Sequence, residues 1–129
     1  MNIVSAFLRL CCILLACYST TVVAQPAYPS GSIRWVVPFP PGGGTDILAR
    51  TLGQKLNEAW HVPVVMDNRG GANGTIGTAY VAKADPDGQT LLIVPSGFAV
   101  NPSIYKNLPY DSNKDLAPVT QLAASPLIL

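Results

Sequence analysis

The stretch Ile33–Leu56 constrains the fold more than any other part of this 129-residue chain. It opens with Ile33–Val37, whose β-branched and aromatic side chains are typical of a buried parallel strand. Prolines end the strand, glycines follow at 42–44, and Thr45 and Asp46 are residue types that favour a helix N-terminus. Apolar side chains then recur at helical spacing. The sequence therefore predicts a strand, a bare glycine loop and a helix.

The same order of elements recurs further along the chain. We expect the first helix to end near Trp60, and further strands, loops and helices to follow it. The expected strands are Val62–Met66, Thr90–Val94 and Pro118–Ala124, and the expected helices are Thr75–Ala84, capped by Asn73, and a short one capped by Asn101. This alternation predicts an α/β domain with a mostly parallel sheet, flanking helices and right-handed crossovers.

The loops after the first three strands are expected at one edge of such a sheet. They span residues 38–46, 67–74 and 95–101, and they are rich in glycine, proline and small polar residues. Ligands of open α/β sheets bind outside the carboxyl ends of the strands, which is this edge. A helix start also has unpaired N–H groups and partial positive charge. The three loops together therefore predict a binding site for an anion.

The first 24 residues have the pattern of a secretory signal peptide. Residues 1–9 carry one positive side chain, residues 10–17 are apolar, and Val22-Val23-Ala24 ends in a small residue. We therefore expect cleavage after Ala24, export, and a mature domain of residues 25–129. Because Leu14-Leu15-Ala16-Cys17 resembles a lipobox, a lipoprotein whose first residue is Cys17 is the alternative.

Composition excludes several classes of function. All three cysteines lie within the predicted signal peptide, so the mature chain would have no disulfide, no thiolate nucleophile and no cysteine-based zinc site. Without Arg9, seven basic side chains balance seven acidic ones and form no basic run, which argues against nucleic acid as a partner. We expect no metal and no cofactor.

Two nucleotide-binding patterns fit the first glycine loop only in part. A Walker A loop needs a lysine that does not follow Gly44, and the dinucleotide fingerprint needs a glycine where Ile47 stands. Asp67, at the end of the second strand, stands where a ribose-binding acid is expected. A dinucleotide-binding α/β enzyme domain therefore remains the alternative.

Catalysis has little support in the sequence. His61, the single histidine, is expected just past the first helix, at the end opposite the glycine loop. Ser96 has no histidine placed to activate it, and Asp85 and Asp87 belong to a turn. For Asp46 we expect a helix N-cap in which one carboxylate oxygen caps and the other meets a ligand. The sequence therefore predicts a binding protein rather than an enzyme.

A series of motifs in order along the chain resembles a known receptor family. They are Tyr28-Pro29, Ile33 to Asp46, Asp67-Asn68-Arg69 with Gly71 to Gly77, residues 84–92, Asn101-Pro102, residues 108–111 and residues 114–119. They closely resemble the start of the mature receptors of tripartite tricarboxylate transporters, also called Bug periplasmic binding proteins. The likeness covers nearly the whole mature chain.

The resemblance implies a type II periplasmic-binding-protein-like fold, in which two α/β lobes close on a small carboxylated solute and deliver it to membrane transporter subunits. We expect a monomer in the periplasm. In this family, loop amides, hydroxyls and bridging waters hold the ligand carboxylate more than a dedicated arginine does. Carried onto this chain, the ligand-binding residues are Phe39, Gly42, Gly43, Gly44, Thr45, Asp46, Ala72, Asn73, Ser96 and Gly97.

The resemblance also implies an incomplete lobe, because family members are more than twice as long. Residues 25–129 would be the first part of lobe 1, without lobe 2 and the return segment. The chain ends on three aliphatic residues, as if within a strand, and a non-functional truncated product is a further alternative. We expect residues 25–129 alone to be poorly packed. A cooperative melt together with micromolar carboxylate binding would contradict this expectation.

Overall fold

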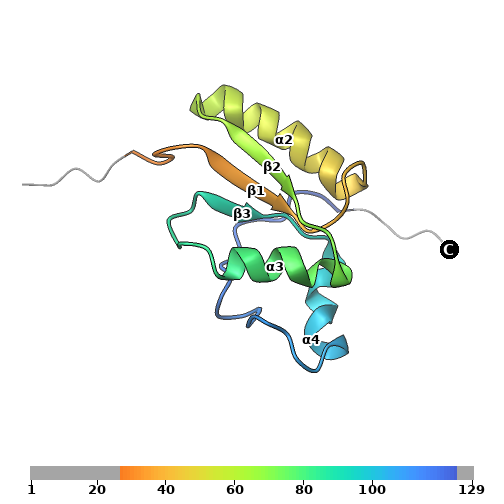
Figure 1. The fold of residues 1–129 in the computed structure, drawn as a ribbon. Helices are drawn as coiled ribbons and strands as arrows, with labels where there is room; N and C mark the ends of the chain where they lie inside the picture. The colour runs from red at the N-terminus through yellow and green to blue at the C-terminus, as the bar shows by residue number, and fades with distance from the viewer. Residues whose placement is uncertain (1–26, 125–129) are drawn as a thin grey trace, which may run out of the picture.

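The computed structural model describes residues 27–124 (Figure 1). The predicted signal peptide, its cleavage site and the last aliphatic residues lie outside the described residues. The elements in chain order are β1 (Ile33–Val37), α2 (Gly44–Trp60), β2 (Val64–Asn68), α3 (Thr75–Ala82), β3 (Thr90–Leu92) and α4 (Asn101–Ile104), with 3-10 turns at Ala72–Gly74 and Ser96–Val100. None of the helices among the described residues is both long enough and apolar enough to span a membrane.

The three strands form one parallel sheet in the order β2-β1-β3. β1 lies in the centre, where Val36 pairs with Asp67 of β2 and with Leu92 of β3. Helix α2 covers one face of the sheet and α3 the other (Figure 1). The predicted α/β fold with a parallel sheet and flanking helices is therefore confirmed for the described residues.

The main core lies between β1 and α2. Trp35, Val37, Ala49 and Ile93 form its buried centre, and partly buried leucines of α2 pack around them. Ile33, Val36 and Val37 are 0% exposed, because the central strand is covered on both faces. Gly53 of α2 lies so close to Met66 of β2 that an added Cβ would clash with the Met66 methyl group. These contacts fix α2, and with it the glycine loop, against the sheet.

Several predicted boundaries are wrong. β2 begins at Val64 rather than Val62 and continues to Asn68, because Asn68 still pairs with Val37. α3 ends at Ala82, and β3 ends at Leu92. The predicted fourth strand, Pro118–Ala124, is also wrong, because these residues are exposed and belong to no strand. Suitable residue types are not enough to form a strand, because the backbone N–H and C=O groups of the segment must also bond to a neighbouring strand.

The three predicted side-chain caps are wrong for a common reason. The N-cap residues are Gly43 for α2, Gly74 for α3 and Val100 for α4, and none makes a side-chain cap hydrogen bond. Asp46, Asn73 and Asn101 instead form hydrogen bonds that connect different loops and elements. At this edge of the sheet, polar side chains that favour caps hold the loops together.

Candidate functional site

The three loops predicted to share a sheet edge do meet there, at the end of the sheet toward which the arrows point in Figure 1. Two hollows lie between them. The inner cavity, of about 110 Å³, has walls from all three loops, namely Pro38, Phe39, Asn73, Gly74, Thr78, Val94, Pro95, Gly97, Phe98 and Asn101. The outer groove, of about 360 Å³, is lined by Phe39, Pro40, Pro41, Gly43, Gly44, Thr45, Asp46 and Pro95. Phe39 and Pro95 line both hollows, so the two are adjacent.

Most of the predicted ligand-binding residues line one of these hollows. The first loop brings Phe39 to both of them, and Gly43, Gly44, Thr45 and Asp46 to the outer groove. Asn73 and Gly97 line the inner cavity. The remaining three, Gly42, Ala72 and Ser96, are exposed on the same loops but line neither hollow.

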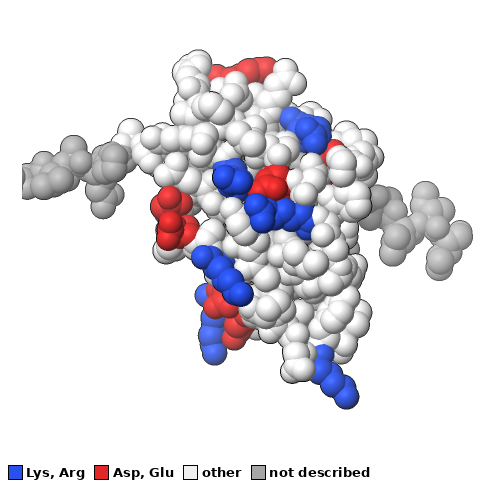
Figure 2. Space-filling view, viewed as in Figure 1, with Lys and Arg blue, Asp and Glu red and all other residues white. Residues whose placement is uncertain are grey.

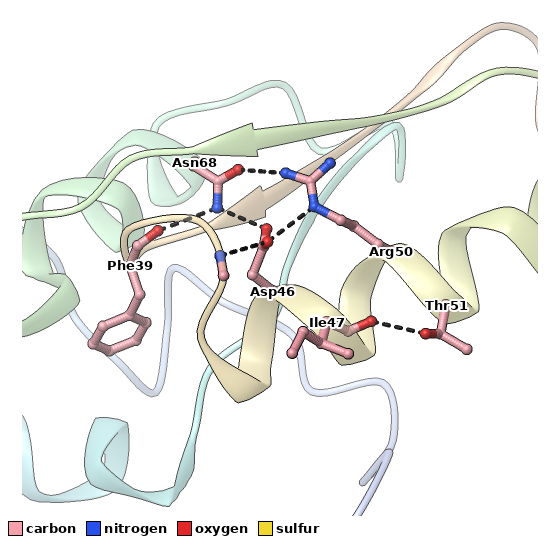
Figure 3. A network of polar contacts seen from close by, with 7 residues as sticks. Phe39, Asp46, Ile47, Arg50, Thr51 and Asn68 are labelled. Carbon is pink, nitrogen blue, oxygen red and sulfur yellow. Dashed lines mark hydrogen bonds and ion pairs between the residues drawn. The ribbon is translucent and has the colours of Figure 1, made fainter.

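Asp46 is the centre of a polar network beneath the glycine loop (Figure 3). One carboxylate oxygen, Oδ2, accepts hydrogen bonds from the Gly42 N–H and from Arg50 Nε, each at 2.9 Å. The other, Oδ1, accepts from Asn68 Nδ2 at 2.9 Å. Because both oxygens accept from groups of the protein and the residue is 3% exposed, the expected division of one oxygen for a cap and one for a ligand is wrong. Asp46 holds the loop in shape.

Asn68 and Arg50 complete this network, and sequence reasoning missed both. Asn68, the last residue of β2, also donates to the Phe39 carbonyl at 3.2 Å, and its side-chain oxygen Oδ1 accepts from Arg50 Nη2 at 3.1 Å. The hydrogen bonds from Arg50, then from the Gly42 N–H and the Asn68 amide, hold the pKa of Asp46 far below its ordinary value against the opposing effect of burial. Asp46 is therefore an anion paired with Arg50, and the pair has no net charge.

This neutral pair leaves the start of α2 available to an anion. The N–H groups of Gly44, Thr45 and Asp46 open the helix, so no carbonyl lies one turn before them to accept their hydrogen bonds. All three residues line the outer groove. A helix N-terminus carries partial positive charge, and here the nearest carboxylate is already compensated. The groove is therefore suited to a carboxylate or a similar anion.

The inner cavity is walled by aromatic rings and by two amides. Asn73 has left-handed backbone geometry, with φ 50°, and its Nδ2 donates to Oδ1 of Asn101 at 3.1 Å. Asn101 is only 2% exposed. Phe98 stacks on the buried ring of Tyr110, with ring centroids 6.4 Å apart. Sequence reasoning treated Asn101 only as a cap and overlooked its place in the cavity wall.

Asp67, the residue that favoured a dinucleotide, is held by two arginines. Its Oδ2 accepts from Arg69 Nε at 2.9 Å and from Arg34 Nη1 at 3.2 Å. Partial burial would raise the pKa of Asp67, but the hydrogen bonds from Arg69 and Arg34 outweigh it and the pKa is lowered. This carboxylate is thus engaged within the protein, and it lines neither hollow. The alternative loses the feature that supported it.

The surface charges are mixed. On the face in Figure 2, lysine and arginine side chains lie beside aspartate and glutamate in small groups of both signs. Among the described residues, ion pairs join Lys55 to Glu58 and Lys114 to Asp111. Within residues 27–124, no group of three or more histidine, cysteine or acidic residues is arranged to hold a metal ion.

Comparison with known proteins identifies the family. Residues 48–129 match the sequence model of the tripartite tricarboxylate transporter family receptor. The chain belongs to this receptor family. The resemblance seen in the sequence motifs is therefore confirmed.

Curated relatives of this receptor-family chain are similar over most of its length. A UPF0065 protein in the tcbD-tcbE intergenic region of Pseudomonas sp. (strain P51) is 45% identical over 111 residues, which are 86% of this chain and 33% of that protein. Protein BugT of Bordetella pertussis is 44% identical over 109 residues, 83% of this chain and 33% of BugT. The chain thus spans about a third of the length of these relatives.

Solved structures of similar receptors share the fold. Periplasmic binding protein BugD is 46% identical, with a TM-score of 0.62 over 65% of this chain and 28% of BugD. Rpa4515 of R. palustris, solved with adipate, is 38% identical, with a TM-score of 0.64 over 67% of this chain and 29% of its own. MatC of Rhodopseudomonas palustris, with bound malate, is 34% identical, with a TM-score of 0.64 over 68% of this chain and 30% of MatC. The predicted fold class, part of a periplasmic-binding-protein lobe, is confirmed.

Proposed function

We propose that this chain is part of an exported receptor that binds a small carboxylated metabolite and delivers it to a tripartite tricarboxylate-type transporter. The proposal rests mainly on the outer groove, where the first residues of α2 line a hollow beside a neutral Asp46–Arg50 pair. Two relatives with similar folds have adipate and malate in their structures, and both are small dicarboxylates. Family membership supports the role in transport.

In this proposal the carboxylate lies against the start of α2. Gly43, Gly44 and Thr45 would contribute N–H groups and a hydroxyl. Phe39, which lines both hollows, would contact the ligand where the two hollows adjoin. Asn73 and Gly97 would contact the part of the ligand that reaches the inner cavity. Gly42, Ala72 and Ser96 would take part through their exposed loop positions or through bridging water. Asp46 would act by fixing the loop.

The larger architecture is also proposed. Residues 25–129 would be the first part of lobe 1 of a two-lobed, monomeric receptor whose second lobe closes over the groove. Such a receptor binds and releases its solute without chemical change, and its partners would be the membrane subunits of the transporter. The similarity to proteins described as periplasmic supports a periplasmic location after export.

A titration of the purified chain tests the binding proposal. Malate, adipate and citrate are added separately while the backbone amide signals are followed by NMR. We expect the amides of Gly43, Gly44 and Thr45 to shift progressively, with Kd values in the millimolar range, because about 4 kcal/mol of binding free energy is reasonable for an open groove that contacts one end of the ligand.

Two further titrations provide the controls. Succinamide, which has the size of a dicarboxylate but no charge, should leave these amide signals unchanged. NAD tests the dinucleotide alternative in the same way. A response to NAD with none to the carboxylates would refute the proposal, and a chain whose spectrum lacks dispersed amide signals would favour the truncated, non-folding product.

A further inference from the structure

We infer that Asn101 is a positioning residue of the binding site: through its hydrogen bond to Asn73 it locks the second loop to the third and sets the shape of the inner cavity. This inference rests on the proposed function, because the shape of the cavity matters only if a ligand enters it. It assigns to Asn101 a role distinct from the helix cap that its sequence context suggests.

The contact between the two asparagines joins segments that are distant in the sequence. Asn73 Nδ2 donates to Asn101 Oδ1 at 3.1 Å, and Asn101 Nδ2 lies 3.5 Å from the Asn73 carbonyl. Asn101 is the last residue of the third loop and the first of α4, whereas Asn73 lies within the second loop. The pair therefore forms a two-point connection between loops that the backbone does not connect locally.

The turn that contains Ala72 and Asn73 is the part that this contact would hold, because of its backbone conformation. Ala72 and Asn73 both have positive φ, 45° and 50°, a region that residues with a Cβ occupy infrequently. The Asn73 side chain itself is exposed, so the buried partner supplies the fixed end of the contact. The hydrogen bond that Asn73 donates to the 2%-exposed Asn101 amide can hold this turn in place.

A backbone hydrogen bond within the turn at Ala72–Gly74 can report whether the turn stays closed. Gly74 donates its N–H to the Gly71 carbonyl at 2.9 Å, within the same turn, and Gly74 lines the inner cavity. Thr78, also in the cavity wall, donates its hydroxyl to the Gly74 carbonyl at 2.8 Å. If Asn101 locks the turn, removal of its side chain should expose the Gly74 amide to exchange before the rest of the domain opens.

The first experiment measures amide hydrogen exchange by NMR in the full chain and in Asn101→Ala. The reference is the N–H of Ile93, which bonds to the Val36 carbonyl in the sheet. We expect the ratio of the Gly74 rate to the Ile93 rate to rise at least fivefold in Asn101→Ala. General destabilisation would raise both rates together, so an unchanged ratio would overturn the inference.

Two variants separate the effect of the Asn73–Asn101 hydrogen bond from the effect of losing a side-chain hydrogen bond elsewhere. Asn101→Asp keeps an oxygen that can accept from Asn73 Nδ2, so its ratio of Gly74 to Ile93 exchange rates should equal that of the wild type. This variant therefore tests the inference even if Asn101→Ala does not fold. Asn57→Ala removes an amide that donates to the Val62 carbonyl at the opposite end of α2, and it should leave the ratio unchanged. An Asn101→Asp ratio as high as that expected for Asn101→Ala would contradict the inference.

The second experiment measures the Kd for malate. Loss of one such hydrogen bond should weaken malate binding roughly fivefold in Asn101→Ala and leave it unchanged in Asn57→Ala. In an Asn73→Gly background, where the lock has no donor, Asn101→Ala should have little additional effect on Kd. Equal effects in both backgrounds would mean that Asn101 acts without Asn73 and would overturn the inference.

The two experiments also separate this inference from the proposed function. If the wild-type chain binds none of the carboxylates, the proposed function fails while the exchange ratio still decides whether Asn101 holds the turn. If malate binds and the Gly74 ratio does not respond to Asn101→Ala, the proposed function stands and the inference fails.

Discussion

Among single residues, Asp46 fixes the first loop most directly. It stands in the first turn of α2, yet it accepts from Gly42 before the helix, from Arg50 one turn later and from Asn68 at the end of β2 (Figure 3). A single carboxylate therefore joins the loop, the helix and the sheet. Hydrogen bonds to a charged acceptor are stronger than those to a neutral one, so its ionisation matters for stability.

Substitution Asp46→Asn should lower the thermal midpoint of the chain at pH 7 by several degrees, because the ion pair with Arg50 and the strong bond from Gly42 are lost. The pKa of Asp46 is lower in the folded chain than the ordinary carboxyl value of about 3.9. Its stabilising effect is therefore complete above that value and declines as pH falls below it. The difference between wild type and variant, measured by circular dichroism, should shrink below about pH 4.

The control for this substitution is Asp85→Asn, in the exposed turn after α3, which should shift the midpoint little at any pH. A wild-type advantage that stayed constant down to pH 2 would mean that the charge of Asp46 does not stabilise the fold.

Residue types predicted where the loops meet better than they predicted which side chains bond to one another. The three loops meet at one sheet edge as predicted, and most of the predicted site residues line one of the two hollows there. The partners of Asp46, Asn73 and Asn101 could not be predicted, because a residue that can cap a helix can also bond across space. The local sequence gives no information about which partner lies nearer.

At the scale of elements, α3 depends on its close approach to the turn after β1. An added Cβ at Gly77 would stand 2.7 Å from Pro38 Cβ and 2.8 Å from the Arg69 carbonyl oxygen. Two of the three nearest atoms belong to the backbone, so they cannot move aside as a flexible side chain would. Gly77 therefore allows the helix to lie against the first loop and to bring Thr78 to the inner cavity.

Substitution Gly77→Ala should therefore destabilise the chain. Overpacking of roughly 1–3 kcal/mol is expected to exceed the gain in helix propensity, which is about 1 kcal/mol. The measurement is the urea midpoint, followed by circular dichroism. Gly97→Ala is the matched control, because an added Cβ there meets no atom within 4 Å. A midpoint for Gly77→Ala at or above that of the wild type would show that the first loop can move away.

The strands and helices were largely predictable because each has strong local signals. β1, α2 and α3 follow from apolar runs and from glycine or proline at their ends. The ends of β2 and β3 were missed, since pairing with β1 decides them. Pro118–Ala124 has residue types that suit a strand, but within the described residues it pairs with no strand and is exposed.

At the scale of the whole molecule, the chain combines a small core with apolar side chains on its surface. Val65, Ile76 and Val119 are more than half exposed, and Ile104 is 61% exposed. The chain also spans about a third of its curated relatives. The expectation that residues 25–129 alone are poorly packed agrees with this surface and stays a prediction.

The export of the chain can be tested by intact mass. When the chain is produced with its own N-terminus in a Gram-negative host, we expect the periplasmic product to begin at Gln25, with no lipid attached. Cys17→Ala should then give the same mass, because the substituted residue is removed with the signal peptide. A lipidated product that begins at Cys17, and that Cys17→Ala abolishes, would establish the alternative.

The parallel order of the strands has one more consequence. Phe39, Asn73 and Asn101 come from three separate turns of the chain, yet they line the same inner cavity. No short synthetic peptide cut from this sequence can therefore mimic the pocket. A transplant of its binding properties into another scaffold would have to carry the sheet along with the loops.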